Sequence, residues 1–233
     1  MAMNERRLFL RAAGASLIVA GCTRSSDGHA GDRSGSSDND IEVTPPEDLM
    51  REHGVLNRIL LIYDECAERL EGNKDFPMLA LSRSATLIHD FVEQYHEKME
   101  EEFVFPRFEK AGKLVELVAV LRHQHATGRT ITDSVRRLCT GPTLTSDPAR
   151  HSLALGLRTF VRMYRPHEAR EDTVLFPAFR SVVPTREFHE LGEQFEDREH
   201  SLFGKNGFEV IVQQVETSER ELGIYDLARF TPE

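Results

Sequence analysis

Two short segments of the chain share one arrangement of metal-binding residue types. His96 is followed four residues later by Glu100, and His167 is followed four residues later by Glu171. In both segments a Phe-Pro pair comes next, and its proline lies ten residues after the histidine. A histidine and a glutamate four positions apart lie on one face of a helix, so both can reach the same metal ion. One such pair is a weak signal, but two copies with matching tails favour a metal site.

Two more histidines lie on the apolar stripes of other predicted helices. Counting from the turns near Asn73 and Gly112, at about 1.5 Å of rise per residue, places His53, His125 and the first pair at nearly one level. The turn before the fourth helix is less well defined, so its pair is placed only roughly. A single such histidine is commonly a hydrogen-bonded core residue, but four on facing stripes favour ligands. The predicted ligands are His53, His96, Glu100, His125, His167 and Glu171.

Four imidazoles and two carboxylates are too many for one tetrahedral zinc ion. They suit two first-row ions with the glutamates as bridges, because imidazole binds iron, zinc, copper and nickel while carboxylate favours harder ions. Two divalent ions bring four positive charges, which two carboxylates and a bridging hydroxide would largely neutralise. The ligand types therefore predict a site for two metal ions.

Helices must position these ligands, since the apolar residues follow helical spacing and no strand pattern is convincing. The stop signals are Gly72-Asn73, Gly112 and Gly141-Pro142. Short connections between long helices make neighbours antiparallel, which predicts an all-α, up-down-up-down four-helix bundle. The predicted helices cover about residues 47–70, 76–110, 113–138 and from 147 onward.

The pattern resembles the hemerythrin-like, or HHE cation-binding, family over about residues 48–181. The segment from Gln124 and His125 to Gly128 and Arg129 also resembles the third-helix motif of many bacterial members. The resemblance implies a non-haem di-iron centre in a four-helix bundle that reacts with oxygen or related small molecules. By match to the family motifs, the six residues above would be the ligands of two iron ions.

The sequence departs from the oxygen-carrying hemerythrins at two places. Those proteins have a second histidine one turn from the first on the third helix, where this chain has Leu121 and Arg129 around His125. Their last helix ends in an aspartate ligand, where this chain has the pair ending in Glu171. One imidazole fewer leaves the iron more open, which favours reaction with peroxide, oxygen or NO over reversible oxygen carriage.

Three functions remain open at this point. The first is binding or sensing of oxygen or NO, and the second is an oxidoreductase that consumes peroxide or NO, although no flavin, haem or iron–sulfur motif supplies its electrons. The third is iron handling or storage, which the acidic net charge of -10 mildly favours. The same charge argues against nucleic-acid binding. Whether the protein is an enzyme, and which electron donor or signalling partner it meets, stays open.

The first 22 residues predict export. Arg6-Arg7 with the following apolar residues resembles a twin-arginine signal, and the stretch from Val19 to Cys22 resembles a bacterial lipobox. Both together predict a lipoprotein anchored in the membrane through Cys22, with its body outside the cytoplasm; an uncleaved N-terminal anchor is the alternative. The predicted divisions are a signal peptide (1–22), a flexible linker (23–46), the bundle (47–181) and a C-terminal helical extension (182–233).

The extension is expected to form two helices joined by a turn at residues 204–207 and to pack on the bundle or on a second copy. His189, Glu193, Glu196 and His200 share one of its faces, where a solvated face is favoured over a second metal site.

Smaller predictions concern the remaining reactive side chains. Cys66 and Cys139 lie on different predicted helices, and packed free thiols are favoured over a disulfide. Glu168 and Asp172 are candidates to orient the histidines. Surface or rim positions are predicted for His89 and His123, and core packing is favoured over a redox or hydrogen-bonding role for Tyr63 and Tyr164.

Overall fold

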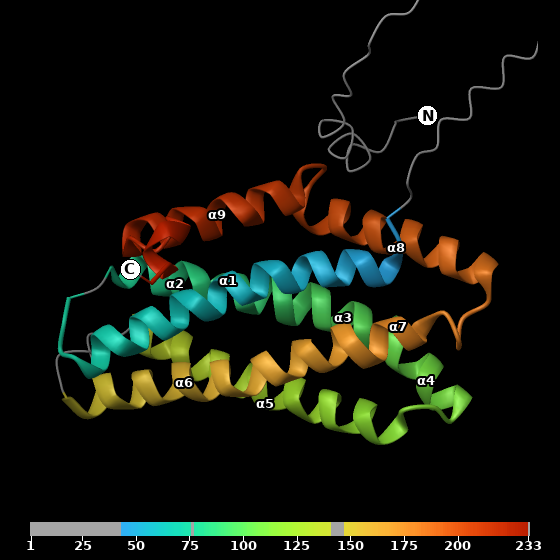
Figure 1. The fold of residues 1–233 in the computed structure, drawn as a ribbon, viewed down its shortest axis with the longest axis horizontal. Helices are drawn as coiled ribbons and strands as arrows, with labels where there is room; N and C mark the ends of the chain where they lie inside the picture. The colour runs from blue at the N-terminus through green and yellow to red at the C-terminus, as the bar shows by residue number, and fades with distance from the viewer. Residues whose placement is uncertain (1–42, 76, 141–146, 233) are drawn as a thin grey trace, which may run out of the picture. The chain divides into compact units, whose positions relative to one another are not determined.

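A computed structural model describes residues 43–75, 77–140 and 147–232. Its compact unit is Thr44–Glu233. Within the described residues every regular element is a helix, as the sequence predicts (Figure 1). The predicted signal peptide, the predicted lipidation site Cys22 and nearly all of the predicted linker lie outside the described residues. None of the described helices is long and apolar enough to cross a membrane.

The first helix, α1 (Pro45–Glu71), begins two residues earlier than predicted. The backbone N–H of Thr44 donates to the Glu47 carboxylate at 2.8 Å, which satisfies one group at the helix start. Two prolines occupy the first positions, where a helix needs no N–H donor. Both prolines are buried.

The second helical segment is continuous in sequence, but two π-helical stretches interrupt its α-helical winding. It consists of α2 (Met78–Leu87), η3 (Ile88–His96), α3 (Glu97–Met99), η4 (Glu100–Val104) and α4 (Phe105–Ala111), of which η3 and η4 are π-helical. It ends at Gly112, whose φ of 64° is in the left-handed region that favours glycine. The predicted stop at this glycine is confirmed.

The third and fourth segments follow the predicted boundaries to within two residues at each start. They are α5 (Val115–Thr140) and α6 (Asp147–Arg170), and α6 continues through the π-helical η6 (Glu171–Leu175) into α7 (Phe176–Phe179). The α1 helix packs against α6, and α5 packs against α6 and α2. Leucine, phenylalanine, tyrosine and alanine side chains from all four segments fill the space between them.

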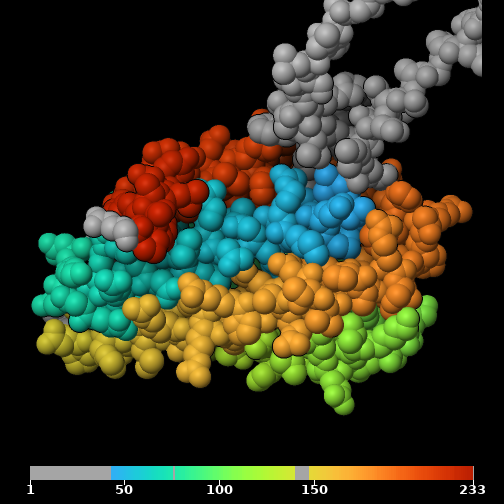
Figure 2. Space-filling view, in the orientation of Figure 1, coloured from blue at the N-terminus to red at the C-terminus, as the bar shows by residue number. Residues whose placement is uncertain are grey.

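The extension is formed by α8 (Thr185–Phe203), α9 (Gly207–Leu222) and the short 3-10 turn η7 (Leu227–Phe230). It packs on the bundle: the Phe203 ring meets Phe91 at 5.7 Å and Tyr95 at 5.5 Å. Figure 1 shows α8 and α9 along one side of α1, with α5 and α6 on the other side. Figure 2 shows the atoms of α8 and α9 lying directly against α1.

The two cysteines among the described residues, Cys66 and Cys139, are free thiols, as predicted. Cys66 is fully buried, and Cys139 is partly buried. Burial raises the pKa of Cys66 to about 12 and the pKa of Cys139 to about 11. Both thiols are therefore protonated and unreactive at neutral pH.

Candidate metal centre

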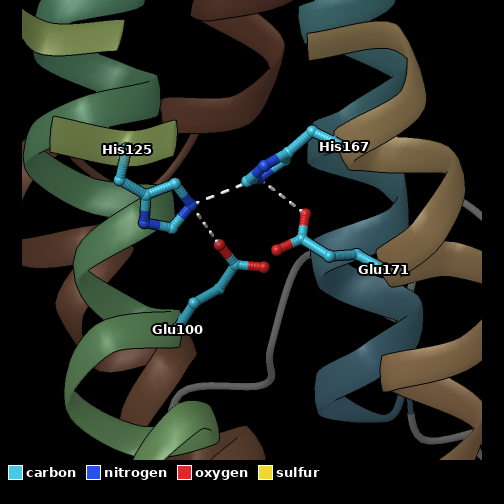
Figure 3. Close-up of side chains that lie close together, drawn as sticks. All are labelled: Glu100, His125, His167 and Glu171. Carbon is cyan, nitrogen blue, oxygen red and sulfur yellow. Dashed lines mark hydrogen bonds and ion pairs between the residues drawn. The ribbon is translucent and has the colours of Figure 1, made fainter. Parts of the chain in front are cut away.

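The six predicted ligands converge in the interior of the bundle. Each is at most 3% exposed. Their ligand atoms form two groups that share Glu100, and within each group the atoms lie within 4.8 Å of one another. Figure 3 shows four of these side chains pointing toward one another from three helical segments. The first group is Glu100, His125, His167 and Glu171, and the second is His53, His96 and Glu100.

Each glutamate lies between two histidines. One Glu100 oxygen is 3.8 Å from His96 Nε2, and the other is 3.4 Å from His125 Nε2. A single oxygen of Glu171 is 3.4 Å from His53 Nε2 and 3.1 Å from His167 Nε2. Each carboxylate therefore lies between histidines of two different helical segments.

All four histidines direct Nε2 toward the centre, because an oxygen atom of another residue accepts a hydrogen bond from Nδ1. Carboxylates and the amide oxygen only accept hydrogen bonds, so each Nδ1 carries a proton and each Nε2 faces the centre. The four acceptors are named here the acceptor ring. His53 donates to Asp172 at 2.7 Å, His96 to Glu52 at 2.7 Å, His125 to Glu101 at 3.2 Å and His167 to Gln124 at 2.9 Å.

The acceptor ring has a cyclic order. Each helical segment supplies the acceptor for the histidine of the segment that follows it in the chain, and the fourth supplies the acceptor for the first. Each acceptor is also the sequence neighbour of a predicted ligand, as Glu52 is of His53 and Gln124 is of His125. A residue one position away is rotated by about 100° around the helix, which directs it at the adjacent helix.

The inward-facing atoms have no partner of opposite charge among the described residues other than the histidines. His125 Nε2 and His167 Nε2 lie 3.2 Å apart, and with both protons on Nδ1 neither can donate to the other. The four carboxylate oxygens of Glu100 and Glu171 are buried and accept no hydrogen bond. Buried polar atoms of this kind are costly unless a cation satisfies them, so the donor set fits bound metal ions.

The pKa shifts of the buried side chains also indicate that the centre favours a cation. Burial and the nearby Glu171 carboxylate raise the pKa of Glu100 well above its usual value. Burial opposes the ionisation of Glu171, but the imidazoles of His167 and His53 hold its pKa well below the usual value. Burial also opposes the charged form of His53, yet Asp172 and Glu171 raise the pKa of His53 to about 10. In this cluster, protons thus supply positive charge that bound metal ions would otherwise supply.

The Phe-Pro tails explain the local winding. In each copy a π-helical turn begins at the glutamate and ends before the phenylalanine, whose N–H bonds to the glutamate carbonyl. The next residue, Pro106 or Pro177, has no N–H to continue the α-helical ladder. The rings then cover the centre: Phe105 stacks on His125 and Phe176 stacks on His53, each at 5.5 Å. Such single π turns are frequent at functional sites.

The segment that resembles the family's third-helix motif supports the site from α5. A Cβ at Gly128 would lie 2.1 Å from the hydroxyl oxygen of Tyr164. The glycine therefore leaves room for that hydroxyl, which donates to Glu97 at 2.6 Å. Arg129 donates to Glu97 and to Glu101, each at 2.7 Å, and so balances the charge of the carboxylate that holds His125.

The outcome for the orienting residues is mixed. Asp172 accepts a hydrogen bond from His53 as predicted, whereas Glu168 accepts one from Asn57. Sequence reasoning missed Glu52, Glu101 and Gln124, although their position beside the ligands is a usable signal.

The tyrosines and the outer histidines follow the sequence more closely. Tyr63 is buried in the core, and Tyr164 combines core packing with its hydrogen bond to Glu97. His123 is exposed and His89 is partly exposed, as predicted. Within the described ranges, no group that could hold a metal ion forms around His189 and His200.

Comparisons with known proteins give a family match. The model of the hemerythrin HHE cation binding domain matches residues 44–179. An uncharacterised protein of Mycobacterium bovis is 51% identical over 193 residues, which cover 83% of this chain and 76% of that protein. An uncharacterised protein of Mycobacterium tuberculosis matches with the same values. No solved structure gives a significant match.

Proposed function

The chain belongs to the hemerythrin HHE cation-binding family, and we propose that it holds a non-haem pair of iron ions within an up-down-up-down bundle. One observation carries the proposal. Four buried imidazoles, each with Nδ1 fixed by an acceptor, direct four Nε2 atoms toward the four buried carboxylate oxygens of Glu100 and Glu171. Eight such donor atoms suit two ions and exceed what one ion takes from a protein.

The donor atoms divide into two halves. His53 and His96, with ring centroids 4.7 Å apart, would hold one ion, and His125 and His167, 5.0 Å apart, would hold the other. Glu100 and Glu171 would each give a carboxylate to both ions, since each lies between histidines of the two halves. On a six-coordinate iron, four donors from the protein would leave positions open. The preference for iron over zinc rests on the family match, because four donors also suit tetrahedral zinc.

Open positions on an iron pair would supply binding and electron exchange for oxygen, NO or peroxide. The protein's own part is to exclude water and to keep the histidines in one orientation. Phe105 and Phe176 cover His125 and His53 with apolar rings, and the acceptor ring fixes the tautomer of all four imidazoles. We therefore favour reaction with a small molecule over iron storage; turnover with an added electron donor would distinguish an oxidoreductase from a binding or sensing protein.

The experiment that tests iron binding compares two histidines of α5. His125→Ala removes a predicted ligand, whereas His123→Ala removes an exposed histidine two residues away. The parent chain, purified without oxygen, is expected to contain about two irons, and His125→Ala is expected to lose at least one while keeping its helical circular dichroism. His123→Ala is expected to match the parent.

Two results would contradict the proposal. Unchanged metal content in His125→Ala would remove His125 from the ligand set. Zinc alone in the parent, with no change in absorption on exposure to oxygen, would leave a metal-binding bundle without oxygen chemistry.

We also propose export, on the sequence of residues 1–22 alone. The twin-arginine pair and the lipobox ending at Cys22 support a lipoprotein that is anchored outside the cytoplasm. Mass spectrometry of the membrane-extracted protein is expected to find a lipid-modified Cys22 as the first residue. A soluble protein that retains Met1 and Arg6-Arg7 would contradict export.

A further inference from the structure

A pocket of about 440 Å³ lies beside the metal centre, on the groove between α5 and α6. Its volume is within the range of small-molecule sites in proteins. Most of its lining is apolar and comes from both helices and from the π-helical turn η6. The apolar lining residues are Leu114, Leu117, Val120, Leu121, Pro166 and Val174.

Three polar residues complete the lining, namely Gln124, His167 and Arg170. The first two are committed to each other, because His167 donates its Nδ1 proton to Gln124 at 2.9 Å. Arg170 differs from most arginines of the chain, since it has no carboxylate partner among the described residues. Arg170 is exposed and is the charged side chain of the rim, so its guanidinium is free to pair with an anionic ligand.

From the apolar walls and the single cation at the rim, we propose that this pocket binds a small organic carboxylate with an apolar tail. The tail would lie against the leucine and valine side chains, where burial of each methylene favours binding. The carboxylate would pair with the guanidinium of Arg170, whose planar group suits a carboxylate.

The ligand would contact only α5, α6 and η6, so its binding does not require a metal ion. Its place matters for the centre because His167 forms part of the pocket wall and also directs Nε2 toward Glu171 at 3.1 Å. A bound tail would cover the His167–Gln124 hydrogen bond on its solvent side. This second consequence, in contrast to the binding itself, rests on the proposed function.

The test is isothermal titration calorimetry of the full chain with octanoate, acetate and 1-octanol. Octanoate is expected to bind at least about 10-fold more tightly than acetate, because only its tail reaches the apolar walls. Arg170→Gln is expected to weaken octanoate about 3- to 10-fold and to leave 1-octanol unchanged. Val120→Trp, at a position that is 53% exposed, is expected to fill the pocket and weaken both ligands more than about 10-fold.

Two matched controls use α6 outside the pocket. Arg162→Gln removes an exposed arginine, and Leu155→Trp enlarges an apolar side chain that is 59% exposed. Both are expected to bind octanoate as the parent does. Absence of octanoate binding, or equal binding by Val120→Trp and the parent, would overturn the proposal. Repeating the titration on chelator-treated chain separates the two hypotheses: retained binding with no iron in the parent would contradict only the iron centre.

Discussion

The two sides of the centre differ although their ligands match. On the His96 side, the acceptor Glu52 lies behind the extension: its carboxylate groups with Asp48 and with Glu199 of α8, and Tyr95, which donates to Glu52, packs on Phe203. On the other side, the pocket of α5 and α6 reaches His167 itself. The His96 side is therefore covered by a further layer of helices, whereas on the other side the pocket reaches a predicted ligand directly.

The acceptor ring shows the same division. His53 and His96 donate to carboxylates, whereas His167 donates to a neutral amide and the carboxylate that holds His125 is paired with Arg129. A carboxylate acceptor makes an imidazole a stronger metal ligand than a neutral acceptor does. In the proposed iron-loaded protein, the His53–His96 half would therefore hold its ion more firmly, and the His125–His167 half, which adjoins the pocket, would be the one that meets small molecules.

The largest expected effect tests the covered side. Phe195 of α8 is 1% exposed and its ring lies 5.7 Å from Phe103, so Phe195→Ala leaves a cavity where the extension meets the bundle. We expect the free energy of unfolding to fall by about 3–5 kcal/mol, measured by urea denaturation. The control on the open side, Val120→Ala, is expected to change it by about 0.5 kcal/mol or less. A loss below about 1 kcal/mol for Phe195→Ala would contradict tight packing of the extension.

A smaller effect tests the support of the open side. Gly128→Ala drives a methyl group into the Tyr164 hydroxyl, so Tyr164 must leave Glu97 or the helices must move apart. We expect a loss of about 1–3 kcal/mol in the free energy of unfolding. Gly54 of α1 has open space around its Cβ position, and Gly54→Ala is expected to stabilise the helix by about 0.5–1 kcal/mol. Equal melting temperatures for the two variants would refute the close contact at Gly128.

The sequence predicts much of this site because its signals are periodic. The ligands recur at helical spacing, and Gly112 and the turn at residues 204–207 mark where helices end, so the helical elements follow from the sequence. The acceptor ring does not follow, because Glu52 or Gln124 looks like an ordinary polar residue until the neighbouring helix is placed. The π-helical turns at Glu100 and Glu171 are also missed, since a change from four-residue to five-residue bonding leaves little trace besides the following proline.

The smallest expected effect bears most directly on the two halves, because it exchanges their acceptors. Glu52→Gln keeps a hydrogen-bond acceptor for His96 but removes its charge, and we expect affinity for the more tightly held ion to fall about 10-fold, or about 1.4 kcal/mol. Gln124→Glu gives His167 a carboxylate, and we expect the more weakly held ion to bind more tightly by a similar factor. Competition with a chelator measures the affinity for each ion in the parent chain and in both variants. If the parent chain loses both ions in one step and each variant does the same, the acceptors do not set the difference between the halves.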